Sequence, residues 1–437
     1  APPFWVTAAE AGVPVSVLGL PYSAPPPEIE GLRWLAGRGV PDLELSSGRA
    51  LVLTSRTGDS SFEGGQTLGL ERRGDVFQGR IPGPSVPGLG SVDLQARFRV
   101  DRQARAVDFE VFGQPIRLVE GETSDWVTLR YQFTEDLQAR AQVRFTAIEA
   151  FNELEIYVSP RTVEPQQPWL AISSPPDWAA RLEDQHGAYH SQGHSDGLAA
   201  LEAGLLSPEL FDGLLARDFD QQLALTLGEL QRDEARLIVS GFTLSEQAPA
   251  AGLPLAATLE RVDAAVARVQ ADLRPQDQLL VVSDHGQQPL RQLLLLGQVL
   301  QQLGSEAQVQ GPLVRPAPGE DLEVLSQELL AFEVLGERPV LALEPLQGGL
   351  LVQLAPGWQL EDDPRRVITR TELSVPSVLR AGHAASVPAD TSGLVLLPRP
   401  VQGPVHIADI APTVLLLLGV PAPSHYEGKV LSEETQR

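Results

Sequence analysis

The chain has 437 residues, of which 43% are hydrophobic and 21% are charged, a composition typical of folded globular proteins and not of disordered ones. Lysine and arginine number 33 against 57 acidic residues, so the formal net charge is −24, which argues against nucleic acid as a bulk partner. Cysteine is absent, which excludes disulfides, thiolate metal sites and a cysteine nucleophile.

Methionine is also absent, even at position 1. We therefore expect that a targeting or pro-segment has been removed, or that a longer protein precedes Ala1. No apolar run approaches the roughly 20 residues that a membrane-spanning helix needs, so no span is predicted. Because methionine and cysteine oxidise most readily, their absence slightly favours an exported or extracellular protein.

The first residues combine a short helix at 4–12 with a buried strand at 13–20 that Pro21 ends. A helix that leads into a buried strand is typical of the middle of an alternating strand and helix array. From 49 to 159 the pattern changes to apolar residues at every second position, which predicts antiparallel strands. We expect these strands at 50–54, 92–100, 107–111, 126–133, 141–148 and 154–158.

Helical spacing dominates 177–230, and 255–273 has the apolar stripe of an amphipathic helix. The run 277–283 is continuously apolar, as in a strand buried on both faces. A helix at 290–303, a strand at 340–343 and a closing helix at 407–418 follow. We expect residues 1–48 to form the first part of an α/β core, 49–165 a β-rich insertion, and 166–437 the rest of the core.

The sharpest motif is Ser283-Asp284-His285-Gly286, directly after the apolar run 277–283. In open α/β sheets, ligands bind beyond the carboxyl ends of the strands, where Asp284 and His285 could together face one cation. The alternative is that Asp284 caps the next helix while His285 packs in the turn.

Ser-Asp-His-Gly after an apolar strand resembles the second-metal motif of the alkaline phosphatase superfamily, in its type I phosphodiesterase and nucleotide pyrophosphatase branch. Other segments resemble that branch in the same order, namely 12–15, 39–43, 124–127, 155–160, 407–413 and 427–431. The resemblance implies an α/β fold with an alkaline-phosphatase-like core, whose mixed or mostly parallel sheet lies between helices, and an inserted β-rich subdomain.

In that family, two metal ions activate a Ser or Thr nucleophile and clamp the phosphoryl group. The resemblance implies that this nucleophile and the first Asp ligand would precede Ala1. It places Leu244 and Ala248, which cannot bind a metal, at an Asp and a His ligand position. Asp284, His285 and His383 occupy the remaining ligand positions. These three residues would bind either a residual divalent metal, with zinc the first expectation, or no metal.

The sequence bears on three further kinds of chemistry. His186, His190 and His194 recur every four residues, which would suit a metal on a helix, although Gly187 and Gly193 favour a surface loop. The sequence has no Gly-x-Ser-x-Gly elbow, which argues against a serine hydrolase of that type. It also lacks a Walker or dinucleotide-binding glycine pattern.

The sequence therefore predicts a non-catalytic member of the superfamily, a pseudoenzyme with a binding or structural role. Its partner would be an unidentified protein or another copy of itself. The alternative is a metal-dependent phosphodiesterase or phosphatase whose metal site is incomplete or is completed in trans.

Overall fold

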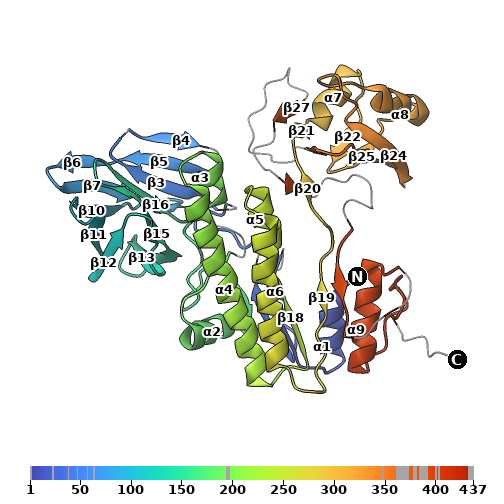
Figure 1. Cartoon of the computed structure of the whole chain (residues 1–437), viewed down its shortest axis with the longest axis horizontal. Helices are drawn as coiled ribbons and strands as arrows, with labels where there is room; N and C mark the ends of the chain where they lie inside the picture. Colours follow the sequence, from blue (N-terminus) through green and yellow to red (C-terminus); the bar gives the residue numbers. More distant parts are fainter. Residues whose placement is uncertain are drawn as a thin grey trace. The chain divides into compact units, whose positions relative to one another are not determined.

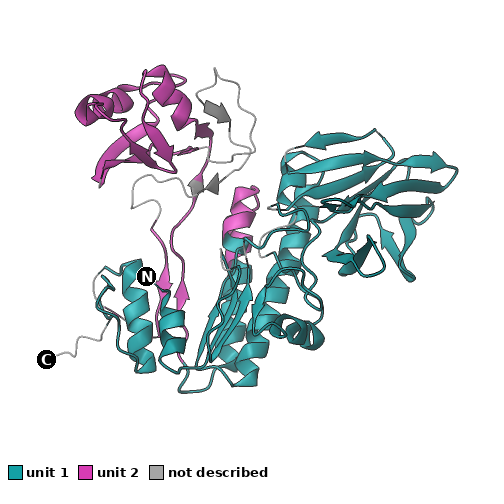
Figure 2. Cartoon of the chain, turned by 180° about the vertical axis from the view of Figure 1, so that it is seen from behind, with its two compact units in different colours: residues 1–245, 260–277, 403–437 teal, residues 246–259, 278–402 magenta. Residues whose placement is uncertain are grey.

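A computed structural model describes residues 2–360 apart from 22–23, 38, 47, 57, 63, 193–196 and 347. Beyond residue 360 it describes 374–376, 381–382, 392–398, 401 and 404–431 (Figure 1). The chain divides into two compact units (Figure 2). The first comprises residues 1–245, 260–277 and 403–437, and the second comprises residues 246–259 and 278–402.

The first unit contains a four-stranded sheet in the order β17 (Ser173–Ser174), β2 (Leu32–Ala36), β1 (Val15–Leu20) and β18 (Leu237–Ser240). β1 pairs in parallel with both β2 and β18, so Val17 lies opposite Trp34 on one side and Val239 on the other. Val17 is fully buried, as the apolar run of β1 predicts.

The helices that lie wholly within the first unit are α1 (Phe4–Glu10), α2 (Trp178–His186), α3 (Leu198–Glu202), α4 (Pro208–Arg232), η1 (Ile407–Asp409) and α9 (Ile410–Leu418). The Ser207 hydroxyl caps α4 by accepting a hydrogen bond from the Leu210 amide at 3.3 Å. Asp233, in a left-handed conformation, ends the helix. α4 packs against β1 and β18.

A strand-rich region follows the first strands of this unit. One five-stranded sheet has the order β12 (Gln114–Val119), β11 (Ala106–Val111), β10 (Leu94–Asp101), β7 (Val76–Ile81) and β6 (Glu71–Arg73). A second has the order β15 (Phe145–Ala150), β16 (Leu154–Val158), β3 (Ala50–Thr54), β5 (Gly65–Gly69) and β4 (Ser60–Phe62). Two hairpins complete the region, β13 (Val127–Gln132) with β14 (Gln138–Val143), and β8 (Ser85–Val86) with β9 (Gly90–Ser91).

One hydrophobic core holds the strand-rich region together. Phe98 of β10 and Phe145 of β15 both pack against Phe109 of β11, with ring centroids 5.2 and 5.0 Å apart. On β10, Phe98 and Val100 face this core whereas Arg97 and Arg99 are exposed, which is the alternation that a half-buried strand requires. The predicted strands at 50–54, 92–100, 107–111, 126–133 and 154–158 are confirmed, with end shifts of at most two residues. The strand predicted at 141–148 is wrong, because that segment is divided between β14 and β15.

A fully buried carboxylate joins α4 to the four-stranded sheet. Glu229 accepts a hydrogen bond from the Ser16 hydroxyl at 2.7 Å and lies 3.3 Å from Arg33. Arg232 contacts its other oxygen at 3.0 Å. Two guanidinium groups thus offset the cost of burying this charge.

The second unit has its own core. It contains a four-stranded sheet, β22 (Gln308–Gln310), β23 (Leu313–Arg315), β25 (Gly349–Leu354) and β24 (Val340–Leu346), and a three-stranded one, β26 (Trp358–Leu360), β21 (Gln292–Leu294) and β27 (Ser374–Pro376). Two short pairs are β19 (Val281–Val282) with β29 (Val395–Leu396), and β20 (Gln288–Pro289) with β28 (Ala381–Gly382). The helices α7 (Leu296–Gln302) and α8 (Leu322–Ala331) pack on the same core, with Leu329 and Trp358 buried at its centre.

The predicted fold class is wrong. Instead of one mixed or mostly parallel sheet between helices, the described strands form many small and mostly antiparallel sheets, with no central parallel sheet flanked by helices. Parallel pairing is confined among the described strands to β1 with β2 and β18, β3 with β5, and β21 with β26. The predicted division at residues 48 and 165 stays a prediction.

The run 277–283 accounts for much of this difference. Only Val281 and Val282 form a strand, which pairs antiparallel with β29, and Val282 is 40% exposed. The following helix begins at Leu296 and not at 290. The expected amphipathic helix does form as α6 (Leu255–Asp272), but Leu255 and Leu259 each expose about half of their surface. No helix in the described ranges is long and apolar enough to cross a membrane.

Candidate functional site

The predicted Asp284–His285 pair lies in an open turn after β19. His285 Nε2 is 3.6 Å from the Asp284 carboxylate, and the two side chains are 34% and 76% exposed. His285 Nδ1 lies 3.0 Å from the Gly286 carbonyl oxygen, and the Ser283 hydroxyl donates to the His285 carbonyl at 2.8 Å. The alternative that Asp284 caps a helix is not observed, because the next helix begins at Leu296.

The described donor set around this turn is too small for a catalytic zinc site. Zinc in such sites takes three protein ligands, whereas Asp284 and His285 offer two. No group of three or more His, Asp or Glu side chains that could hold a metal is found in the described part of the chain. His383, the third expected ligand, lies outside the described residues.

The two positions that the resemblance assigns to metal ligands lie on α5 (Leu244–Ala250). Leu244 is 3% exposed and Ala248 is 1% exposed, so both side chains are part of the packed interior. Neither carries an oxygen, nitrogen or sulfur atom that could bind a cation. Their burial shows that they serve packing at this place in the chain.

The histidine triplet does not form one ligand face. His186 ends α2, and its ring lies so close to α4 that a Cβ added at Gly228 would approach the ring within 2.2 Å. Burial, with a smaller contribution from the Arg232 charge, lowers the pKa of His186. His190 lies in a loop and points toward Asp218 instead, while His194 lies outside the described residues.

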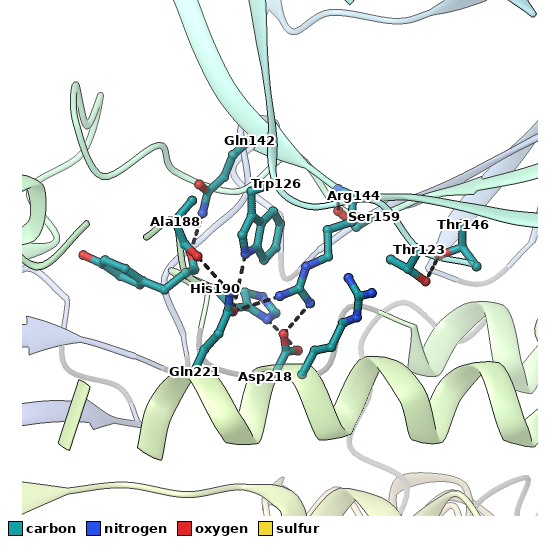
Figure 3. A network of polar contacts seen from close by, with 12 residues as sticks. Thr123, Trp126, Gln142, Arg144, Thr146, Ser159, Ala188, His190, Asp218 and Gln221 are labelled. Atoms are coloured by element: carbon teal, nitrogen blue, oxygen red, sulfur yellow. Dashed lines mark hydrogen bonds and ion pairs between the residues drawn. The ribbon is translucent and has the colours of Figure 1, made fainter. Parts of the chain in front are cut away.

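His190 belongs to a buried polar group that we call the Arg144 cluster, formed by Arg144, Asp218, His190, Gln221 and Trp126 (Figure 3). Arg144 donates to Asp218 at 2.6 Å and to the Gln221 side-chain oxygen at 2.8 Å. His190 Nδ1 lies 2.9 Å from the second Asp218 oxygen. The Arg144 guanidinium carbon lies 4.1 Å from the centre of the Trp126 ring, a cation–π contact.

The electrostatics of the Arg144 cluster favour an ionised Asp218. Burial by itself raises the pKa of this carboxyl, but the charges and hydrogen bonds of His190 and Arg144 outweigh that effect, so the pKa is lowered overall. The contribution of Asp218 to the free energy of unfolding is therefore complete at pH values above the ordinary pKa of an aspartate. It is lost as the pH falls through the lowered pKa of Asp218 in the folded chain.

The Arg144 cluster connects three segments of the first unit. Arg144 and Trp126 come from the strand-rich region, Asp218 and Gln221 from α4, and His190 from the loop after α2 (Figure 3). Gln221 also donates to the Ala188 carbonyl at 2.8 Å, which fixes that loop. An Asp–His pair can support acid–base chemistry, but His190 Nε2 is buried and has no hydrogen-bond partner in the described structure. The arrangement therefore fits a structural role, in which the Arg144 cluster holds these three segments together.

Sequence reasoning singles out His190 but misses Arg144 and Asp218. The available signal is Arg144 itself, a charged residue in the segment 141–148 that is predicted to be a strand, because a buried arginine needs a partner. Asp218 lies among several acidic residues of a helical segment, and nothing in the sequence distinguishes it.

A comparison of the chain with protein-family models finds no match, and neither does a comparison with curated proteins.

Proposed function

We propose that this chain is a non-catalytic protein, a degenerate relative of the alkaline phosphatase superfamily, that acts through binding or structural assembly. The family relationship rests on the order of the sequence motifs, and the arrangement of the sheets lends it no support. The functional part of the proposal rests on the chemistry of the residues at the expected ligand positions.

The observation that carries the proposal is the burial of Leu244 and Ala248. Both lie inside the chain, so a missing segment cannot restore the ligands that the two-metal mechanism needs there. Two buried apolar side chains at these positions fill space that metal ligands would otherwise occupy. A protein that retained the hydrolytic mechanism would have to replace them with donors from elsewhere.

A hydrolysis assay combined with elemental analysis tests the proposal. We expect no turnover of bis(4-nitrophenyl) phosphate in added zinc beyond that of Asp284→Ala. We also expect the same zinc content in the wild-type chain and in His285→Ala. Sedimentation of the same samples would report self-assembly, which is one of the two binding modes proposed.

One observation favours the alternative, a phosphodiesterase or phosphatase with a single metal at the 283–286 turn. The Asp284 and His285 side chains lie side by side and are accessible to solvent, as an open metal position would require. Turnover that disappears in Asp284→Ala, together with about one zinc per chain that His285→Ala loses, would establish this alternative and contradict the non-catalytic proposal.

A further inference from the structure

A pocket of about 420 Å³ lies in the first unit, lined by residues at the start of α1, at the start of α9 and in the segment that follows α9. Its aromatic lining comes from Phe4, Trp5 and Tyr426, and Pro2 and Pro3 add apolar surface. Sites for small molecules have volumes of about 300–1,000 Å³, so this pocket is large enough for a small ligand. None of its lining residues belongs to the expected metal site or to the Arg144 cluster.

Hydrogen bonds tie two walls of the pocket together. The Tyr426 hydroxyl donates to the Pro2 carbonyl oxygen at 3.2 Å and lies 3.2 Å from the Thr7 hydroxyl. These contacts join the segment after α9 to α1, and α1 and α9 themselves pack side by side (Figure 1). The fold itself therefore holds the aromatic lining in position.

The segment after α9 is also fixed to η1. Asp409 accepts a hydrogen bond from the Lys429 amide at 2.7 Å. Gly428 permits the close approach, because a Cβ at this position would collide with the Ala408 carbonyl oxygen. Ala408 and Gly428 both line the pocket, so this contact fixes another part of its wall.

Most of the pocket surface is carbon. Nε1 of Trp5 is buried, so the accessible part of this indole ring consists of carbon atoms. Phe4 packs edge-on against Trp5, with ring centroids 4.9 Å apart, and the Pro2 carbonyl already accepts from Tyr426. A ligand group with several N–H donors would therefore find few free acceptors here and would lose hydrogen bonds that it makes to water.

The charge of the pocket is negative. Glu427 is exposed, and among the described lining residues it is the only one with a charged side chain. The starts of the two neighbouring helices do not reverse this sign. Asp409, at the start of α9, accepts hydrogen bonds from the amides of His406 and Lys429, and α1 has only 7 residues. The net charge of −24 on the whole chain acts in the same direction.

We propose that this pocket binds the quaternary ammonium group of a choline-type compound. Aromatic rings attract a cation that lies over their faces, and the Glu427 carboxylate adds the opposite charge. A trimethylammonium group donates no hydrogen bonds, so it does not need the acceptors that the pocket lacks. The inference goes beyond the proposed non-catalytic function, because it uses none of the residues at the expected metal-ligand positions.

Isothermal titration calorimetry of the full chain with choline chloride tests the site. The uncharged compound 3,3-dimethyl-1-butanol is the matched ligand, because it has nearly the same shape with carbon in place of the nitrogen. We expect choline to bind about five- to thirtyfold more tightly than this alcohol, as a desolvated cation on aromatic rings should. Equal affinities would mean that the pocket selects only apolar shape, and would overturn the proposal.

Two variants assign the binding to this pocket. Trp5→Leu should weaken choline binding by about five- to thirtyfold, and its melting temperature checks that the chain is folded. Glu427→Gln, at an exposed position that can be changed without disturbing the core, should weaken it by up to about fivefold. Glu10→Gln is the matched control, because this exposed carboxylate at the end of α1 does not line the pocket. The control should bind choline as the wild type does.

Phosphatidylcholine vesicles separate the two sources of the same chemical group. Binding of free choline would assign the pocket to a small solute. Binding of vesicles alone, weakened in Glu427→Gln, would assign it to a lipid headgroup. The proposal is overturned if neither choline nor vesicles bind, or if binding in the folded variants at Trp5 and Glu427 equals that of the wild type.

Discussion

Buried charges in the first unit are held by small sets of side chains that neutralise one another. Arg144 is 2% exposed and Glu229 is fully buried, and each of them bonds to at least two partners. Breaking such a set leaves an uncompensated charge in the interior, which costs far more than the loss of a surface pair. Single substitutions at these residues should therefore have large effects.

Replacing Arg144 by Met should lower the free energy of unfolding by about 3–5 kcal/mol, because the largely buried Asp218 carboxylate would lose its arginine partner and keep the contact with the His190 ring. Urea denaturation monitored by tryptophan fluorescence measures the change, and Trp126 lies within the affected cluster. Arg117→Met is the control, because Arg117 pairs with Asp101 and Asp108 on an exposed sheet face. The control should change the free energy of unfolding by about 1 kcal/mol or less. An equally small loss in Arg144→Met would contradict the structural role of the Arg144 cluster.

Among the elements, α4 contacts both the strand-rich region and the four-stranded sheet of the first unit. Asp218 and Gln221 bind the strand-rich region, and Glu229 binds β1 and β2. Its hydrophobic residues pack between these polar contacts, and Ser207 satisfies an amide at its first turn. The precise start of α4 therefore affects the position of Asp218, about three turns further along the helix.

Ser207→Ala should destabilise the chain by about 1 kcal/mol, because the Leu210 amide loses its acceptor. The difference can be read from the urea midpoint. Ser326→Ala on α8 is a suitable comparison, since the Ser326 hydroxyl bonds to the Leu322 carbonyl within the helix and caps nothing. That control should be neutral or slightly stabilising, because alanine is the better helix former. Equal effects of the two substitutions would mean that the cap contributes nothing.

Local sequence patterns were sufficient to predict some strands but not which segments pair or contact one another. Strands such as β10 and β13 were predictable because alternation and turn residues are local properties of the chain. The apolar run 277–283 was misassigned because hydrophobicity does not specify a pairing partner, and most of the run forms no strand. The Asp284–His285 pair was predictable as neighbours in sequence, whereas the Asp218–Arg144 contact joins residues 74 positions apart and left no local pattern.

At the scale of the whole chain, the two units have separate hydrophobic cores. The core of the second unit includes Leu329, Val352 and Trp358, whereas the first unit contains several clusters, including the one centred on Phe98 and Phe145. Which strands share a sheet depends on contacts between segments far apart in the sequence. Local patterns predicted many of the strands, but they could not show that these strands form several small sheets and not one central sheet.

Leu329→Ala should test how separate the units are. Removing this fully buried side chain should destabilise the second unit by about 2–5 kcal/mol through the cavity that it leaves. Hydrogen exchange should accelerate in α7 and β25, while β1 and β16 keep their protection. Uniform acceleration across both units would instead show that the chain unfolds as one cooperative body.

The parallel pairing of β1 with β18 has a consequence for biosynthesis. Val17 lies opposite Val239, so the second edge of this apolar strand stays unpaired until roughly 220 further residues have been made. At the usual speed of synthesis, about 5–20 residues per second, this interval lasts roughly ten to forty-five seconds. Throughout that time a nascent chain presents an apolar strand edge, of the kind that other chains can pair with. The strand-rich region can fold during the same interval, but it cannot supply β18, so demand for chaperones should be greatest before Leu237–Ser240 emerges.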